Sequence, residues 1–119
     1  MAVGVIVPAA GRGSRLGSAE NKIWLEVGGR SLLAWSLEAF HGHPSIDCIV
    51  VAGAEHELDR LRDASSAYDK VAAVVAGGST RAESVWRGLI ALPAVCDTVL
   101  VHDAARPAQV GRWPRRPSA

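Results

Sequence analysis

The sequence has no marked excess of charge of either sign. Its 13 lysine and arginine residues are almost matched by 12 aspartate and glutamate residues, which leaves a net charge of +1 at pH 7. A general nucleic-acid binder or a membrane-surface binder needs a basic excess. The sequence also lacks a run of the ~20 apolar residues that cross a bilayer. We therefore expect neither a nucleic-acid partner nor a membrane partner.

The N-terminus and the cysteines lack the usual signals of secretion and of metal binding. Residues 1–7 carry no basic segment, and Pro8 interrupts the apolar run that follows Met1, so we expect no signal peptide and a cytoplasmic protein. The two cysteines, Cys48 and Cys96, do not have the C-x-x-C spacing of a metal site. Cys48 lies in an apolar run, which favours a buried thiol.

Short apolar segments alternate with helical patterns along the 119 residues, a length that suits a single domain. Apolar strands that alternate with helices predict a doubly wound, mostly parallel α/β sheet with helices on both faces. Ser31 is expected to cap the first helix, and Thr80 with Glu83 to form a capping box at the start of the third. The expected strands are 3–7, 46–52, 70–76 and 98–102, and the expected helices are 31–41, 55–66 and a third from about residue 80.

A glycine-rich loop follows the first predicted strand, in the sequence VIVPAAGRGSRL. Gly11 and Gly13 would let a polyanion approach backbone N–H groups. Arg15 in the loop and Lys22 shortly after it would neutralise its charge. The loop therefore predicts a triphosphate site at the carboxyl end of the first strand, although two such glycines can also form a plain tight turn.

The two common phosphate loops do not fit this segment. The dinucleotide fingerprint needs glycine at its first, third and sixth positions, and here Leu16 takes the sixth position after Gly11 and Gly13. The P-loop needs Gly-Lys followed by Ser or Thr, a triplet that the sequence does not contain. The segment is therefore neither a dinucleotide fingerprint nor a P-loop.

Two more polar clusters follow predicted strands. The segment TVLVHD ends in Asp103, and the segment GGSTRAESV spans residues 77–85. The carboxyl ends of parallel strands lie at one edge of the sheet, where the Asp103 carboxylate could hold Mg²⁺ on a nucleotide phosphate. His102 should point to the opposite side from its neighbour and be packed or hydrogen-bonded. Arg81 could serve the site or pair with Glu83.

These motifs resemble those of the 2-C-methyl-D-erythritol 4-phosphate cytidylyltransferases of the non-mevalonate isoprenoid pathway. The shared patterns are PAAGxGxR, a later lysine, GGxxRxxSV and HDAARP, in this order over residues 3–107. HDAARP is the most specific of them. The resemblance implies a Rossmann-like nucleotidyltransferase fold and the transfer of CMP from CTP to 2-C-methyl-D-erythritol 4-phosphate, with release of pyrophosphate.

The resemblance also implies roles for individual residues and for small molecules. Arg15 and Lys22 would stabilise the transition state, and Asp103 would bind Mg²⁺ or another divalent cation. Arg106, by its place just after this carboxylate and not by the resemblance, could contact the substrate phosphate. The nucleotide-binding residues would be Ala9, Ala10, Gly11, Gly13, Gly78, Ser84, Asp103 and Ala104.

One departure from the family pattern lies around Lys22. The family often has Pro-Lys-Gln-Tyr where this sequence has Asn21-Lys22-Ile23-Trp24. The lysine is kept and an aromatic residue follows two positions later, so we expect the lysine to keep its role. Trp24, Trp35 and Trp86 are expected to be packing anchors rather than base-stacking platforms.

The end of the sequence does not follow the family. After Pro107 it reads AQVGRWPRRPSA, without apolar periodicity. A family member would continue for roughly as long again, with an arm used in homodimerisation and a late lysine and aspartate. We expect residues 1–107 to be the N-terminal part of a nucleotidyltransferase domain, truncated or frame-shifted, and 108–119 to be a disordered basic tail. A genuine basic extension is the alternative.

Two other functions remain open from the sequence. One is a catalytically incompetent nucleotide-binding remnant. The other is a nucleotidyltransferase for ribitol phosphate or a sugar phosphate, which a preference for another nucleotide or acceptor would reveal.

Overall fold

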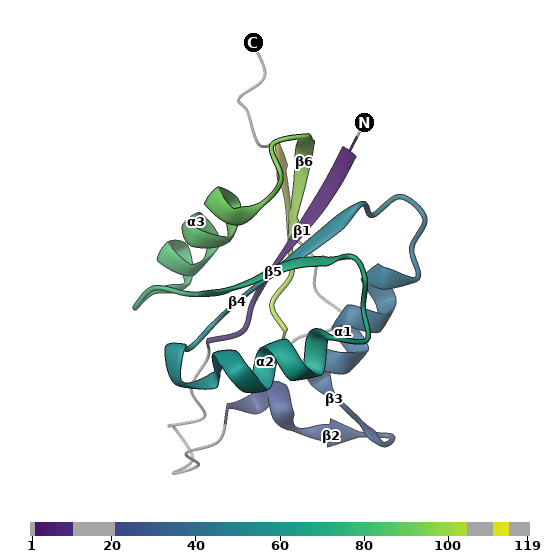
Figure 1. Ribbon diagram of the computed structural model, residues 1–119, viewed down its shortest axis with the longest axis vertical. Coiled ribbons are helices and arrows are strands. Elements are labelled where there is room, and N and C mark those ends of the chain that lie inside the picture. The colour runs from purple at the N-terminus through teal and green to yellow at the C-terminus, as the bar shows by residue number, and fades with distance from the viewer. Residues whose placement is uncertain (1, 11–20, 105–110, 115–119) are drawn as a thin grey trace.

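The computed structural model contains a five-stranded central sheet flanked by helices (Figure 1). It describes residues 2–10, 21–104 and 111–114. The sheet strands are β1 (Ala2–Pro8), β4 (Cys48–Gly53), β5 (Val71–Ala76), β6 (Cys96–Val101) and β7 (Gly111–Pro114), and a small separate sheet pairs β2 (Glu26–Val27) with β3 (Arg30–Ser31). The helices are α1 (Leu32–His41), α2 (Leu58–Ser65) and α3 (Arg81–Ala91), with 3-10 turns η2 (Lys22–Trp24) and η3 (Glu55–Glu57).

The strand order confirms the predicted doubly wound fold. The strands lie in the order β5-β4-β1-β6-β7, so β1 is central. It pairs in parallel with β4 on one side and with β6 on the other, and β4 pairs in parallel with β5. The chain therefore builds the sheet outward from β1 in one direction and then returns to add β6 on the opposite side. This return makes a switch point at the carboxyl ends of β1 and β6, where ligands bind in such sheets.

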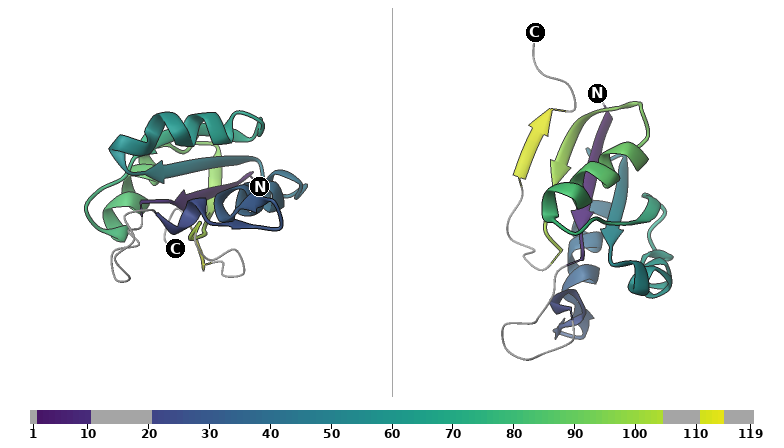
Figure 2. Two further views of the ribbon diagram at one scale, coloured as in Figure 1. Left: turned by 90° about the horizontal axis from the view of Figure 1, so that it is seen from below. Right: turned by 90° about the vertical axis from the view of Figure 1, so that its left-hand side faces the viewer.

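Two apolar layers cover the two faces of the sheet. Val5 and Val7 of β1 pack into one core cluster with Leu37 of α1 and Leu61 of α2. Ile6, which lies between them, points to the opposite face and packs in a second cluster that includes residues of α3. Figures 1 and 2 show α3 on the opposite side of the sheet from α1. The alternation along β1 thus fixes which helices lie on which face.

The second cluster also contains both cysteines. Cys48 and Cys96 are buried thiols that form no disulfide, and their Sγ atoms lie 2.8 Å apart. The expectation that Cys48 is a buried thiol is confirmed. Among the tryptophans, Trp86 is 61% exposed on α3, so the expectation that it is a packing anchor is wrong.

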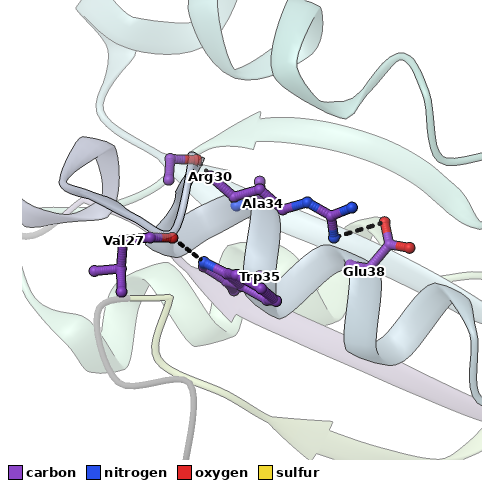
Figure 3. A network of polar contacts seen from close by, with 6 residues as sticks. Val27, Arg30, Ala34, Trp35 and Glu38 are labelled. Atoms are coloured by element: carbon purple, nitrogen blue, oxygen red, sulfur yellow. Dashed lines mark hydrogen bonds and ion pairs between the residues drawn. The ribbon is translucent and has the colours of Figure 1, made fainter.

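The small hairpin of β2 and β3 was not predicted from the sequence. Gly28 and Gly29 make its turn with φ of +62° and +84°, a conformation that favours glycine. The hairpin is tied to α1, because Trp35 Nε1 donates to the Val27 carbonyl at 2.7 Å (Figure 3). Arg30 and Glu38 form an ion pair at 3.8 Å beside this contact. The prediction that Ser31 caps α1 is confirmed, since its Oγ accepts from Ala34 N at 3.1 Å.

The C-terminal segment differs from its prediction in one part. We predict a disordered tail at 108–119, but residues Gly111–Pro114 form β7, which pairs antiparallel with β6. Antiparallel pairing along an edge strand satisfies backbone groups whatever the side chains are. The pattern of apolar residues therefore does not predict this strand. The other tail residues lie outside the described ranges, and the domain boundary at residue 107 stays a prediction.

Candidate functional site

A cavity of about 290 Å³ lies at the carboxyl edge of the sheet. The three sequence clusters singled out above all contribute to its wall. Its described lining residues are Pro8 and Ala10 after β1, Gly78, Ser79, Thr80, Arg81 and Ser84 around the start of α3, and Asp103 after β6. The prediction that these strand ends face one crevice is therefore confirmed for the residues that the structure describes.

Asp103 is held at the cavity by an extension of the sheet ladder. His102 N donates to the Ile6 carbonyl at 2.9 Å, and Ala104 N donates to the Pro8 carbonyl at 3.2 Å. The backbone on both sides of Asp103 is thus fixed to β1. The His102 side chain points into the core, where its Nε2 lies 3.1 Å from Ser36 Oγ and its ring packs edge-on against Phe40. The predicted packed role of His102 is confirmed.

The loop between β5 and α3 forms the opposite wall, and its shape depends on two glycines. A Cβ on Gly78 would lie 2.2 Å from Glu83 Cβ, and a Cβ on Gly77 would lie 2.5 Å from Ser84 Oγ. Gly78 N donates to Ser84 Oγ at 3.2 Å. Only glycine lets the loop approach the first turn of α3 so closely, which brings Gly78 and Ser84 together at the cavity.

The N-terminus of α3 opens onto the same cavity. Thr80 Oγ1 accepts from Glu83 N at 3.1 Å, which confirms Thr80 as the N-cap. The Glu83 carboxylate accepts from Ser79 Oγ at 2.9 Å, so it fastens the loop itself. Arg81 lines the cavity with an exposed side chain. A helix N-terminus with an adjacent cation attracts anions. Sequence reasoning missed Ser79 and Thr80 as lining residues, although both lie inside the GGSTRAESV motif.

The remaining candidate residues are placed differently. Ala9 and Ala104 are buried and pack in the core. Lys22 is exposed and is not among the described residues that line the cavity. It begins η2, directly after Asn21, whose Nδ2 donates to the Ala9 carbonyl at 2.7 Å. The turn that carries Lys22 is thus attached next to lining residue Ala10. Gly11, Gly13, Arg15 and Arg106 lie outside the described residues.

The cavity could hold a divalent cation together with a phosphate ligand. Within residues 2–10, 21–104 and 111–114, no group of three or more His, Cys, Asp or Glu side chains could hold a metal ion. Asp103 is the carboxylate among the described lining residues. Mg²⁺ is commonly held by one or two carboxylates together with substrate phosphates and waters. A single carboxylate beside an anion-attracting helix terminus fits that mode of binding.

The helices of the described residues are also informative about membranes. None of them is both long enough and apolar enough to span a bilayer.

Comparison with known proteins gives a consistent result. The family model of 2-C-methyl-D-erythritol 4-phosphate cytidylyltransferase matches residues 3–111. A relative of that name from Xylella fastidiosa is 47% identical over 116 residues, which cover 90% of this chain and 48% of the relative. One from Clostridium botulinum is 40% identical over 105 residues, which cover 87% and 46%.

Solved structures agree with this comparison. The crystal structure of 4-diphosphocytidyl-2C-methyl-D-erythritol synthase from Anaerococcus prevotii superimposes with a TM-score of 0.76 at 32% identity. The match covers 90% of this chain and 45% of that one. The chain therefore spans just under half the length of these relatives.

Proposed function

This chain belongs to the 2-C-methyl-D-erythritol 4-phosphate cytidylyltransferase family, and we propose that it transfers CMP from CTP to 2-C-methyl-D-erythritol 4-phosphate. The observation that carries the proposal is the meeting of the family's separate motifs around one cavity. Ala10 follows β1, Gly78 and Ser84 follow β5 in the loop and in α3, and Asp103 follows β6, yet all four line the same space. We propose a cytoplasmic enzyme of small molecules, with Mg²⁺ or a similar cation as its cofactor.

The chemistry requires charge neutralisation more than covalent participation by the protein. An oxygen of the phosphomonoester attacks the α-phosphorus of CTP, the bond from that phosphorus to the β-phosphate oxygen breaks, and pyrophosphate leaves. Positioning and electrostatic stabilisation carry such a transfer. A cation bound to Asp103 would supply neutralisation of the phosphate oxygens.

The chain's own residues would then act around the nucleotide. Lys22 and Arg15 would neutralise the triphosphate and the charge that builds up on the α-phosphorus. Backbone N–H groups near Ala10 to Gly13 would cradle the leaving pyrophosphate, and Ala9 would hold the start of this segment by donating to the Ala52 carbonyl at 2.7 Å. Gly78 and Ser84 would hold the cytidine, with Ala104 fixing the backbone beside Asp103, and Arg106 would contact the acceptor phosphate.

The direct test is pyrophosphate release by the purified 119-residue chain with Mg²⁺, a nucleoside triphosphate and 2-C-methyl-D-erythritol 4-phosphate. We expect release with CTP and much less with UTP or GTP. A preference for UTP or GTP, or for ribitol 5-phosphate as acceptor, would contradict the proposal and favour another nucleotidyltransferase.

A nucleotide-binding role without turnover is the second candidate. It concerns the 119-residue chain taken by itself, which spans 46–48% of the length of these relatives. Tight binding of Mg²⁺-CTP by calorimetry without any pyrophosphate release would support it. Release of pyrophosphate at a rate proportional to the concentration of the chain would exclude it.

A further inference from the structure

The turn that carries Lys22 is fixed at its first end by the side chain of Asn21. Asn21 is 7% exposed. Its Nδ2 donates to the Ala9 carbonyl at 2.7 Å and to Glu57 Oε1 at 3.1 Å, while its Oδ1 accepts from Ile23 N at 3.3 Å. The family often has proline at this position, and proline has no side-chain donor. The three hydrogen bonds of Asn21 are therefore ones that a proline side chain at this position could not make.

The other end of the same turn is held by the same carboxylate. Trp24 Nε1 donates to Glu57 Oε2 at 2.6 Å. Arg60, one turn further along the chain, places its guanidinium carbon 3.9 Å from the centre of the Trp24 ring. Each oxygen of Glu57 thus accepts from one end of η2. We call this arrangement the Glu57 clamp, made of Asn21, Trp24, Glu57 and Arg60.

The clamp leaves one side chain of the turn facing solvent. Asn21 is buried in its hydrogen bonds, Ile23 is 1% exposed in the core, and Trp24 is half-buried between Glu57 and Arg60. Lys22 alone among these four is exposed. With its neighbours fixed on both sides and the turn attached beside the cavity, the lysine has a defined point of attachment. A fixed attachment means that the backbone of the turn does not have to be ordered when the ammonium binds a charged group.

We propose that Glu57 is a positioning residue that holds the Lys22 turn against the end of β1 and so directs the Lys22 ammonium to the phosphates of the bound nucleotide. The proposal rests on the function proposed above. Glu57 itself does not line the described cavity. Its effect on the nucleotide must therefore pass through Lys22, and this indirect route makes the proposal testable.

A double-mutant cycle tests the route. The affinity of the 119-residue chain for Mg²⁺-CTP is measured by calorimetry for the wild type, Lys22→Ala, Glu57→Ala and the double variant. If Glu57 acts through Lys22, each single variant weakens binding by roughly tenfold. The double variant is then no weaker than Lys22→Ala. If Glu57→Ala leaves the affinity unchanged, or weakens it by the same factor without Lys22, the proposal is overturned.

Two further variants control for charge and for folding. Glu55→Ala removes the same charge from the same 3-10 turn at an exposed position and should leave the affinity unchanged. Glu57→Gln keeps one acceptor oxygen and should recover part of the loss. If Glu55→Ala weakens binding as much as Glu57→Ala, the effect is one of net charge and the positioning role is wrong.

A separate measurement distinguishes failure of the clamp from failure of the proposed function. The indole N–H of Trp24, assigned by its disappearance in Trp24→Phe, is followed by hydrogen exchange in NMR without nucleotide. Slow exchange in the wild type and Glu55→Ala, with fast exchange in Glu57→Ala, would support the clamp even if CTP did not bind. Equally fast exchange in all three would overturn it, whatever the chain does with CTP.

Discussion

The two walls of the cavity are built in different ways. The wall at the start of α3 is local: Gly78 with Ser84, Ser79 with Glu83 and Thr80 with Glu83 are all within six residues of each other. The wall after β1 is anchored from a distance, since Asn21 bonds to Ala9 and Glu57, and Trp24 also bonds to Glu57. A motif can encode the first wall by itself, whereas the second needs the whole fold to bring its parts together.

Asp103 lines the cavity from the end of β6, beside these two walls, and its removal should have the largest effect. We expect Asp103→Asn to lower turnover by about 10²- to 10³-fold, because it removes the carboxylate that would hold the cation while keeping shape and size. The free energy of unfolding should change little, since the backbone around Asp103 is held by the ladder to β1. Steady-state kinetics and thermal unfolding check both.

The matched control for this substitution is Asp97→Asn, on β6, the strand that precedes Asp103. Asp97 is exposed near the start of β6, at the opposite end from the cavity. The Asp97→Asn variant should keep the turnover of the wild type. An equal loss of turnover in both variants would mean that net charge, and not a cation site at Asp103, explains the effect.

The local wall can be broken by a single methyl group. In Gly78→Ala the new Cβ would lie 2.2 Å from Glu83 Cβ, so the loop and the first turn of α3 must separate. Overpacking of this kind costs about 1–3 kcal/mol in the free energy of unfolding. Because Gly78 and Ser84 line the cavity, CTP affinity should fall as well.

The control is Gly29→Ala in the β2–β3 turn, where φ is +84° and nothing lies within 4 Å of the new Cβ. It strains the backbone without crowding and should lower stability while CTP affinity is kept. A Gly78→Ala variant that binds CTP normally would show that this loop does not shape the site.

The contrast between the walls also explains what the sequence could predict. Short sequence patterns indicate three features of the site: the cap at Thr80, the pair Gly78 and Ser84, and Asp103 at the end of a strand. In the first two, the residues that interact are close in the chain, and the third needs only its own strand. Glu57 could not be found in this way. Its partners Trp24 and Asn21 are 33 and 36 residues away in the sequence. A glutamate next to Glu55 and His56 indicates only the charged, solvent-exposed start of a helix.

The sheet shows the same division. The doubly wound, mostly parallel class of the sheet followed from apolar segments that alternate with helices. The order of the strands was not predicted and comes from the structure. The strand β7 could not be predicted, because Gly111–Pro114 pairs through its backbone with β6 and has no alternating apolar pattern.

A smaller change tests the local wall without crowding it. Thr80→Ala removes the oxygen that accepts from Glu83 N, and loss of such a cap costs about 1 kcal/mol in the free energy of unfolding. Thr80→Ser keeps an oxygen at the same place and should stay near the wild type in urea unfolding. If Thr80→Ala and Thr80→Ser are equally destabilised, the methyl group rather than the cap is responsible.

The smallest effect is expected from Arg60, which contributes to the anchoring of the wall after β1. Arg60→Met keeps the length of the side chain but removes the cation from the face of Trp24, an interaction worth about 0.5–1 kcal/mol at an exposed site. Glu57 still accepts from Asn21 Nδ2 and Trp24 Nε1, so the hydrogen bonds of the clamp should remain and CTP affinity should change by less than about twofold, while the Trp24 indole N–H resonance shifts. The control, Arg62→Met, removes a cation from the same helix that pairs with exposed Asp59 at 3.5 Å, and it should leave that resonance in place. A large loss of CTP affinity in Arg60→Met, with the Trp24 hydrogen bond intact, would mean that the Arg60 guanidinium contacts the nucleotide itself. The elements that anchor the wall after β1 would then also supply a positive charge to the site.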